Sequence, residues 1–146
     1  MITEAQIALV QSSFREILPI AEAAGLLFYE RVFTLAPGTR SMFDDDIGPQ
    51  AKRTMVAVGT AVDGLGDLDV VGPFLVRLGA RHVRYGVRTE HFDVVGTALL
   101  WTLEQGLGER FTPAVRGAWM AAWDVIAGAM REGMSRAEAE LVSQPA

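Results

Sequence analysis

His82 is the residue whose type and spacing point most directly to chemistry. The chain has no cysteine, so a metal or redox role must rest on histidine, carboxylates or a bound cofactor. His82 follows Phe74 and Leu78 at intervals of four residues, which would place all three on one apolar stripe of a helix. An imidazole that faces the protein core needs partners for its ring nitrogens. A metal ion or a backbone carbonyl can be such a partner. The stripe alone favours a structural histidine bonded to a carbonyl.

Three polar side chains are predicted to lie on helical faces that are otherwise apolar. Tyr29 shares its face with Leu26, Val32 and Phe33. A buried phenol usually has a hydrogen-bond partner, and a backbone carbonyl is the ordinary one. Gln50 and Thr54 are four residues apart and therefore share a face of the next helix. Taken alone, these two residues would face solvent about as often as a pocket.

Helix signals divide the chain into seven predicted segments and indicate an all-α protein. The start signals are the capping box of Thr3 and Gln6, Pro19, Gly48-Pro49, Thr89 and Thr112-Pro113. Residues 37–42 should form one short helical turn, and the helix of His82 should span residues 71–82. No hairpin dipeptide separates the Val-rich segments, so we expect no strands.

Composition narrows the class of protein. A chain of 146 residues, half of them apolar, fits one domain, which we expect to span residues 1–134. Residues 135–146 should form a C-terminal helix end and a polar tail that is frayed. The net charge of -5 argues against a nucleic-acid partner. The longest apolar runs are too short for membrane insertion, and no signal peptide is evident, so we expect a cytoplasmic protein. Asp44-Asp45-Asp46 should be a solvated corner rather than a cation site.

The stretch from His82 to Gly96 resembles the proximal region of bacterial single-domain globins and of the globin domains of flavohaemoglobins. In that family the iron-binding histidine is followed by a short corner and then by a His-aromatic-x-x-Val-Gly signature that opens the next helix. Here His82 matches the ligand, and His91-Phe92-Asp93-Val94-Val95-Gly96 matches the signature. The resemblance extends over residues 4 to 134.

The resemblance implies a globin fold of seven to eight helices packed around a haem b pocket. The haem would be held without covalent links, since the chain has no Cys-x-x-Cys-His motif. His82 would bind the iron, and Tyr29, Gln50 and Thr54 would face the gas ligand on the distal side. The other implied haem contacts are Phe43, Arg53, Leu78, Arg81, Tyr85, Val87, Phe92, Val95 and Ile126. Among these, Phe43 would wedge against the porphyrin, and arginines would meet the propionates.

Three positions depart from the flavohaemoglobin pattern. Phe92 stands where that group has a tyrosine, and Met134 stands where it has a glutamate that hydrogen-bonds the proximal histidine. Glu132 lies two residues away, about 200° round a helix, so it is a poor substitute. We therefore expect the second ring nitrogen of His82 to bond to a backbone carbonyl one turn earlier. The third departure, Thr54, adds a hydroxyl to the distal wall.

The function implied by the resemblance is reversible binding of oxygen, and of nitric oxide and carbon monoxide, at five-coordinate iron. Such a protein would store or deliver oxygen or remove nitric oxide, with no catalytic residue assigned. One alternative is a nitric oxide dioxygenase that depends on a separate flavin reductase. Another is a gas sensor or an interaction module that has lost haem. These alternatives remain open at the level of sequence.

Overall fold

The computed structural model describes residues 2–143, which form six α-helices and four short 3-10 helices, with no strand among those residues. The elements are α1 (Glu4–Ile17), η1 (Leu18–Ile20), α2 (Ala21–Leu35), η2 (Pro37–Met42), α3 (Gly48–Asp63), η3 (Gly64–Gly66), α4 (Leu68–Arg84), α5 (His91–Leu107), η4 (Gly108–Arg110) and α6 (Pro113–Ser143). The all-α prediction is confirmed. The α-helices number six rather than seven because the segment at 37–42 is a 3-10 helix.

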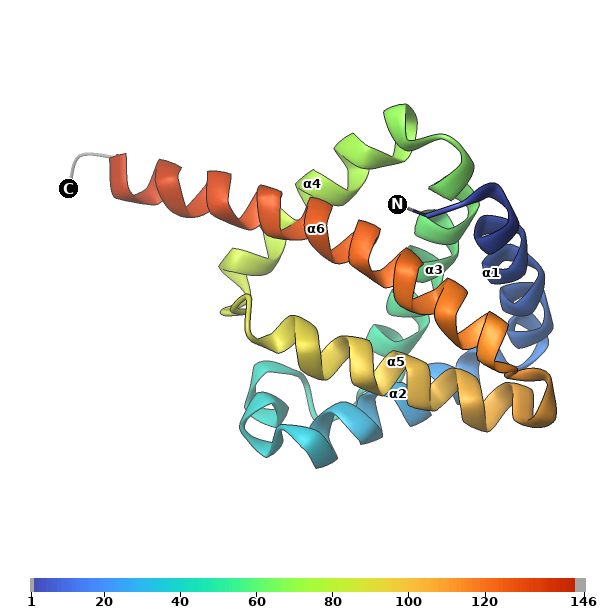
Figure 1. Cartoon of the computed structure of the whole chain (residues 1–146). Helices are drawn as coiled ribbons and strands as arrows, with labels where there is room; N and C mark the ends of the chain where they lie inside the picture. Colours follow the sequence, from blue (N-terminus) through green and yellow to red (C-terminus); the bar gives the residue numbers. More distant parts are fainter. Residues whose placement is uncertain (1, 144–146) are drawn as a thin grey trace.

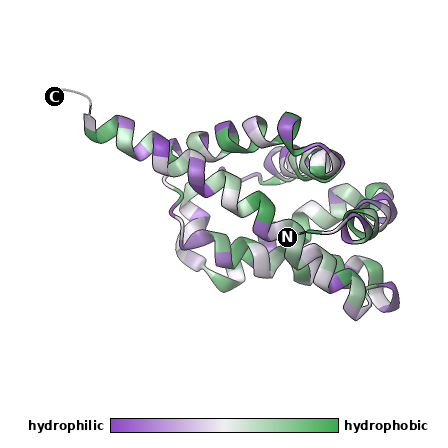
Figure 2. Cartoon of the chain, turned by 45° about the horizontal axis from the view of Figure 1, so that its top comes forward, coloured by the Kyte–Doolittle hydropathy of each residue, from purple (hydrophilic) through white to green (hydrophobic). Residues whose placement is uncertain are grey.

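The helices pack in crossed pairs, with α4 beside α6, α2 beside α5 and α3, and α1 against α6 (Figure 1). The C-terminal end of α6 projects beyond the rest of the molecule. Hydrophobic and hydrophilic residues alternate along the ribbons (Figure 2), as expected for helices with one buried and one exposed face. Within residues 2–143, no helix combines the length and apolar character required to span a bilayer.

Two buried clusters make up the core. The larger joins α1, α2, α3, η3, α5 and the first part of α6, and the smaller joins α4 and the middle of α6 with Ala61 of α3 and Phe92 of α5. Trp123 packs against both clusters and so connects them. In the larger cluster, the indole nitrogen of the buried Trp119 donates to Ser13 Oγ at 2.8 Å, which satisfies both polar groups.

The crossing of α4 and α6 brings their backbones into contact. A Cβ atom at Gly79 would overlap the carbonyl oxygen of Met130, and one at Gly133 would overlap that of Val76. Only glycine permits helices to approach this closely at both positions. The crossing therefore fixes the position of α4, three residues before its His82, against α6.

Three local expectations were wrong. The helix of His82 begins at Leu68, before Val71, because Pro73 is tolerated near its start at the loss of one backbone bond. Pro19 lies in η1 and not in the first turn of α2. The side chain of Leu26 is 41% exposed and so lies off the buried face of α2. Residues 135–143 continue α6 as a helix end, and residues 144–146 of the expected polar tail lie outside the described part of the chain.

The segment from Asp44 to Asp46 is a polar corner, as predicted. Arg40 donates to the carbonyl oxygens of Asp44 and Asp45 at 2.9 and 2.8 Å, which closes the loop. The Asp46 carboxylate accepts from the backbone N–H of Gly48 at 3.0 Å, at the start of α3. No group of three His, Cys, Asp or Glu side chains in residues 2–143 is arranged to hold a metal ion.

Candidate functional site

Tyr29 of α2 forms a hydrogen-bond network with two polar side chains of α3. Its hydroxyl lies 2.6 Å from Thr54 Oγ1, and Gln50 Nε2 donates to it at 3.1 Å. The same amide nitrogen also reaches Thr54 Oγ1 at 3.4 Å. Tyr29 is buried, while Gln50 and Thr54 are half-buried. The phenol is therefore satisfied by side chains rather than by a carbonyl, and neither α3 residue is simply solvent-facing.

A close crossing of α2 and α3 brings these side chains together. A Cβ atom at Gly25 would lie 2.9 Å from the carbonyl oxygen of Ala51, so a larger residue there would push the helices apart. Gly25 is one helical turn before Tyr29, and Ala51 adjoins Gln50. The short distance between Tyr29 and Thr54 is thus a consequence of the small residues at the crossing.

Aromatic rings hold the Tyr29 side chain from several sides. Phe43 meets it edge-on with ring centroids 5.2 Å apart, and Phe28 does so at 5.0 Å. Phe33 lies 5.9 Å from Tyr29 and 5.6 Å from Phe43. These contacts restrict the ring to one orientation, so the hydroxyl stays directed at Gln50 and Thr54.

Proton counting shows what the network can do. The contact between the Tyr29 and Thr54 hydroxyls uses one of their two protons, whichever oxygen is the donor. Gln50 contributes only N–H donors to this pair. One hydroxyl proton therefore remains without an acceptor in the network. The arrangement can donate a hydrogen bond to a small molecule that carries partial negative charge.

His82, near the end of α4, is held by the backbone of its own helix. Its Nδ1 lies 2.6 Å from the carbonyl oxygen of Leu78, one turn earlier, which confirms the expected carbonyl bond. Burial lowers the pKa of the imidazole, the bond to Leu78 opposes that shift, and the charge of Arg81 adds to it. The neutral ring then donates from Nδ1 to the carbonyl and keeps a lone pair on Nε2, which is the form that binds metals.

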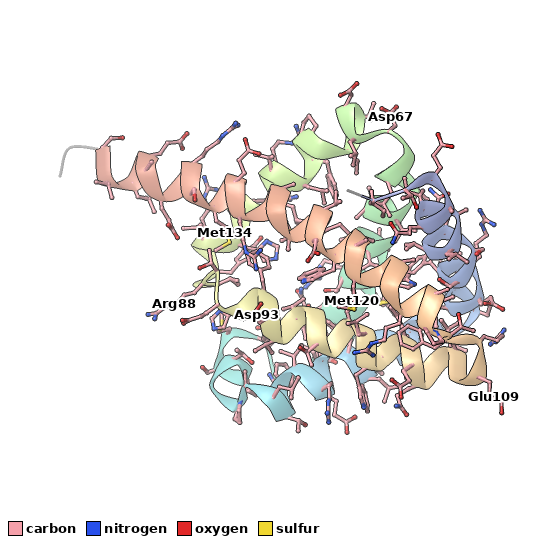
Figure 3. The ribbon with its side chains drawn as sticks, viewed as in Figure 1. Asp67, Arg88, Asp93, Glu109, Met120 and Met134 are labelled. Carbon is pink, nitrogen blue, oxygen red and sulfur yellow. The ribbon has the colours of Figure 1, made fainter. Side chains whose placement is uncertain are left out.

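The side chains that could have hydrogen-bonded His82 in place of a carbonyl do not do so. Phe92 is buried beside Trp123, with ring centroids 6.2 Å apart. Met134 is fully buried where α6 passes α4 (Figure 3). The exposed Glu132 binds Arg136 on the same helix. Within residues 2–143 the only hydrogen-bond partner of the His82 ring is therefore a peptide carbonyl.

Comparison with known proteins identifies the family. Residues 26–130 match the globin family. The chain belongs to that family. Membership implies a haem cofactor, and the neutral His82 with a free Nε2 is a suitable donor for its iron.

Several globins resemble this one over most of its length. An anaerobic nitrite reductase of Oryza sativa subsp. indica is 36% identical, covering 92% of this chain and 97% of that protein. Neuroglobin of Danio rerio is 28% identical, covering 77% of this chain and 79% of its own. A bacterial globin structure from Campylobacter jejuni has a TM-score of 0.83 at 24% identity, covering 94% and 99% of the two chains.

A second solved structure has the same fold. It is an engineered carbene transferase, described as a candidate nitric oxide dioxygenase from Rhodothermus marinus, with a TM-score of 0.88 at 22% identity. The match covers 98% of this globin and 100% of that chain. Likeness at this identity shows the fold alone, and the more similar relatives come from plants and fish. The finer resemblance to flavohaemoglobins stays a prediction.

The predicted haem contacts of this globin fall into two groups. The apolar ones belong to the buried core or pack on it. Phe43 and Val95 pack against the larger cluster. Phe92 and Ile126 are members of the smaller cluster, and Leu78 and Val87 pack against it. The polar ones, Arg53, Arg81 and Tyr85, are exposed. Tyr85 contacts the His82 ring at 5.8 Å between centroids. For all of these residues, contact with haem stays a prediction.

Sequence reasoning missed three features of the site. Arg53 Nη2 donates to Gln50 Oε1 at 3.0 Å, and the spacing of three residues along α3 was the available signal. Thr89 provides no side-chain cap to α5, and the His91 ring accepts the backbone N–H of Arg88 at 2.9 Å in the turn before the helix. Arg88 itself points away from the body of the molecule (Figure 3). The contact of Trp123 with both clusters had no sequence signal.

Proposed function

We propose that this globin binds haem b without covalent links and reversibly binds oxygen, nitric oxide and carbon monoxide. Its role would be to store or deliver oxygen or to remove nitric oxide. The hydrogen-bond network of Tyr29, Gln50 and Thr54 carries this proposal, because it leaves a hydroxyl proton available within a largely apolar setting. We assign no catalytic residue. A cytoplasmic location belongs to the proposal, since the chain has no cysteine.

His82 is the proposed ligand of the haem iron. The Leu78 carbonyl holds its Nδ1 at 2.6 Å, which sets the tautomer and aims Nε2 away from the α4 backbone. Haem iron held by His82 would supply the chemistry that binds a diatomic gas. A carbonyl is a weaker acceptor than a carboxylate, so His82 stays close to neutral and peroxidase-like activity should be weak.

Tyr29 is the proposed main donor to oxygen on the distal side, with Gln50 second. Oxygen that has gained negative charge is stabilised by an O–H or N–H donor more than carbon monoxide is, because carbon monoxide gains little charge. The rings of Phe28, Phe33 and Phe43 hold the phenol in place, so the donor needs little reorganisation to act.

The predicted haem contacts complete the proposal. Phe43 is already packed against Tyr29 and would lie against the porphyrin edge. Apolar contact would come from Leu78, Val87, Phe92, Val95 and Ile126. Among the exposed residues, Arg81 and Arg53 are suited to the propionates, since a guanidinium pairs well with a carboxylate, and Tyr85 would lie beside the ring.

Two enzymatic alternatives are supported by the names of similar proteins. The Rhodothermus marinus structure suggests nitric oxide dioxygenation, for which a separate flavin reductase would supply electrons. Relatives from Oryza sativa subsp. indica and Arabidopsis thaliana, 36% and 32% identical, are named anaerobic nitrite reductases. Reduction of nitrite to nitric oxide takes one electron and two protons and releases water, so it also needs an external reductant. A gas sensor is a further alternative.

The absorption spectrum of the purified protein tests the proposal. We expect a Soret band, and ferrous and oxygenated spectra that interconvert when oxygen is removed and restored. A protein that shows no Soret band after haem is added would contradict the proposal and favour an interaction module. Turnover of nitric oxide or nitrite with a supplied reductase would separate the two enzymatic alternatives from simple gas binding.

A further inference from the structure

Arg53 extends the distal network to the protein surface. Its Nη2 donates to Gln50 Oε1 at 3.0 Å, and the other end of the same amide, Nε2, donates to Tyr29 at 3.1 Å. Arg53 is exposed, Gln50 is half-buried and Tyr29 is buried, so the chain of hydrogen bonds runs from solvent to the interior. Gln50 is the link between a surface cation and the buried hydroxyls.

The chemistry of arginine determines which way the Gln50 amide points. A guanidinium has five N–H donors and no acceptor. If the amide were rotated by 180°, its NH₂ group would face the donors of Arg53, and its oxygen would face Tyr29 and Thr54. That orientation would lose the hydrogen bond to a charged donor and replace it with a contact between two donors. Arg53 therefore selects the orientation in which Gln50 presents NH₂ to the interior.

The orientation of the amide decides whether a proton remains for a gas ligand. With NH₂ facing inward, the Tyr29 and Thr54 hydroxyls share one proton and the second has no acceptor in the network. With the oxygen facing inward, Gln50 would accept that second proton. The network would then be satisfied internally, and a ligand would have to compete for the bond.

We propose that Arg53 is a positioning residue that keeps the Gln50 amide as a donor and thereby leaves one distal hydroxyl proton free for an oxygen ligand. This inference rests on the proposed gas-binding function. It differs from the predicted propionate contact, because here Arg53 acts through Gln50. A propionate contact would hold the haem, whereas the contact with Gln50 fixes which end of the Gln50 amide faces Tyr29 and Thr54.

Two substitutions of Arg53 test the proposal in the haem-loaded protein. Arg53→Met removes the donor at similar length, and Arg53→Glu puts an acceptor there, which should attract the NH₂ group outward and reverse the amide. Matched controls are Lys52→Met and Lys52→Glu, because Lys52 is an exposed cation on the same helix, with no hydrogen bond or ion pair to residues 2–143.

Oxygen release should speed up roughly two- to tenfold in Arg53→Met and at least as much in Arg53→Glu, as expected for the loss of one hydrogen bond. The infrared stretching frequency of added carbon monoxide should rise in the same order, because a nearby donor lowers that frequency. The Lys52 variants should match the parent in both measurements. In a Gln50→Leu background the Arg53 substitutions should have no effect, since the link is gone.

Three outcomes would overturn the inference. One is an unchanged release rate and frequency in both Arg53 variants. Another is an equal change in the Lys52 controls, which would show a general effect of charge. The third is a full Arg53 effect in the Gln50→Leu background, which would show that Arg53 acts directly. If the haem-loaded parent shows no Soret band or no reversible oxygenation, the proposed function fails. If the parent binds oxygen reversibly and only the Arg53 variants leave its release unchanged, this inference alone fails.

Discussion

The two sides of the proposed haem site are constructed differently. On the distal side, Tyr29, Gln50, Thr54 and Arg53 from two helices hydrogen-bond one another through their side chains. On the proximal side, the His82 ring hydrogen-bonds only to the backbone of its own helix among residues 2–143. Side-chain networks change with each substitution, whereas a bond to a peptide carbonyl survives any substitution that preserves the helix. Substitutions of the distal side chains should therefore change the rate of ligand release. Retention of the haem should depend on His82 and on the position of α4.

The largest effect should come from His82→Ala. Loss of the only proposed axial ligand should weaken haem binding and abolish a normal oxygen spectrum. The matched control is His91→Ala, because the His91 ring only accepts a backbone N–H at the α4–α5 corner. Soret absorbance after haem titration measures both variants. A normal oxygen spectrum of His82→Ala without added imidazole would rule out the proximal assignment.

The next effect should be seen in Tyr29→Phe, which keeps the ring and removes only the hydroxyl. A buried donor to partly charged oxygen contributes about 1.5–3 kcal/mol, so oxygen should dissociate roughly ten- to hundredfold faster. Carbon monoxide release should hardly change. Stopped-flow measurement of both gases checks this. If oxygen leaves the parent and the variant equally fast, Tyr29 is a core residue, and Gln50 or Thr54 would be the donor instead.

Thr54→Val should act in the opposite direction and more weakly. Removing the Thr54 hydroxyl takes away an oxygen that can accept a hydrogen bond from Tyr29. The Tyr29 hydroxyl can then donate to the oxygen ligand more of the time. A net hydrogen bond contributes about 0.5–1.5 kcal/mol, so oxygen release should slow roughly two- to tenfold. Thr54→Ser, which keeps the hydroxyl, is the control and should remain near the parent rate.

The smallest effect should come from Glu132→Gln. Its carboxylate binds Arg136 and is exposed, so neutralising it should leave the iron–histidine stretching frequency of the ferrous protein unchanged. That frequency should be low in the parent too, since His82 is bonded to a carbonyl. Resonance Raman spectroscopy measures both. A high frequency in the parent that falls in the variant would show that Glu132 reaches His82 after all.

The proximal side could be predicted from sequence because its interactions are local. His82 and Leu78 are four residues apart on one helix, and the residues at 92 and 134 can accept no proton, so a carbonyl was the remaining partner. The distal side could be predicted only in part. The contact of Tyr29 with Thr54 spans 25 residues and depends on how closely α2 crosses α3 at Gly25, which periodicity does not specify.

The start of α5 shows a different limit. Thr89 has the residue type of a helix cap, but the His91 ring accepts the N–H of Arg88, and the helix begins at His91 without a side-chain cap. Residue type therefore predicted a helix start in the right place but also a side-chain cap that does not form.

The central claim is that the hydroxyls of Tyr29 and Thr54 share one proton and leave the other for the ligand. The most direct test is the oxygen dissociation rate of Thr54→Val measured in two backgrounds, the parent and Tyr29→Phe. In the parent, the substitution should slow release, because it frees the phenol proton. In Tyr29→Phe, it should speed release, because Thr54 is then the only hydroxyl left to donate. Effects of the same sign in both backgrounds would contradict the claim.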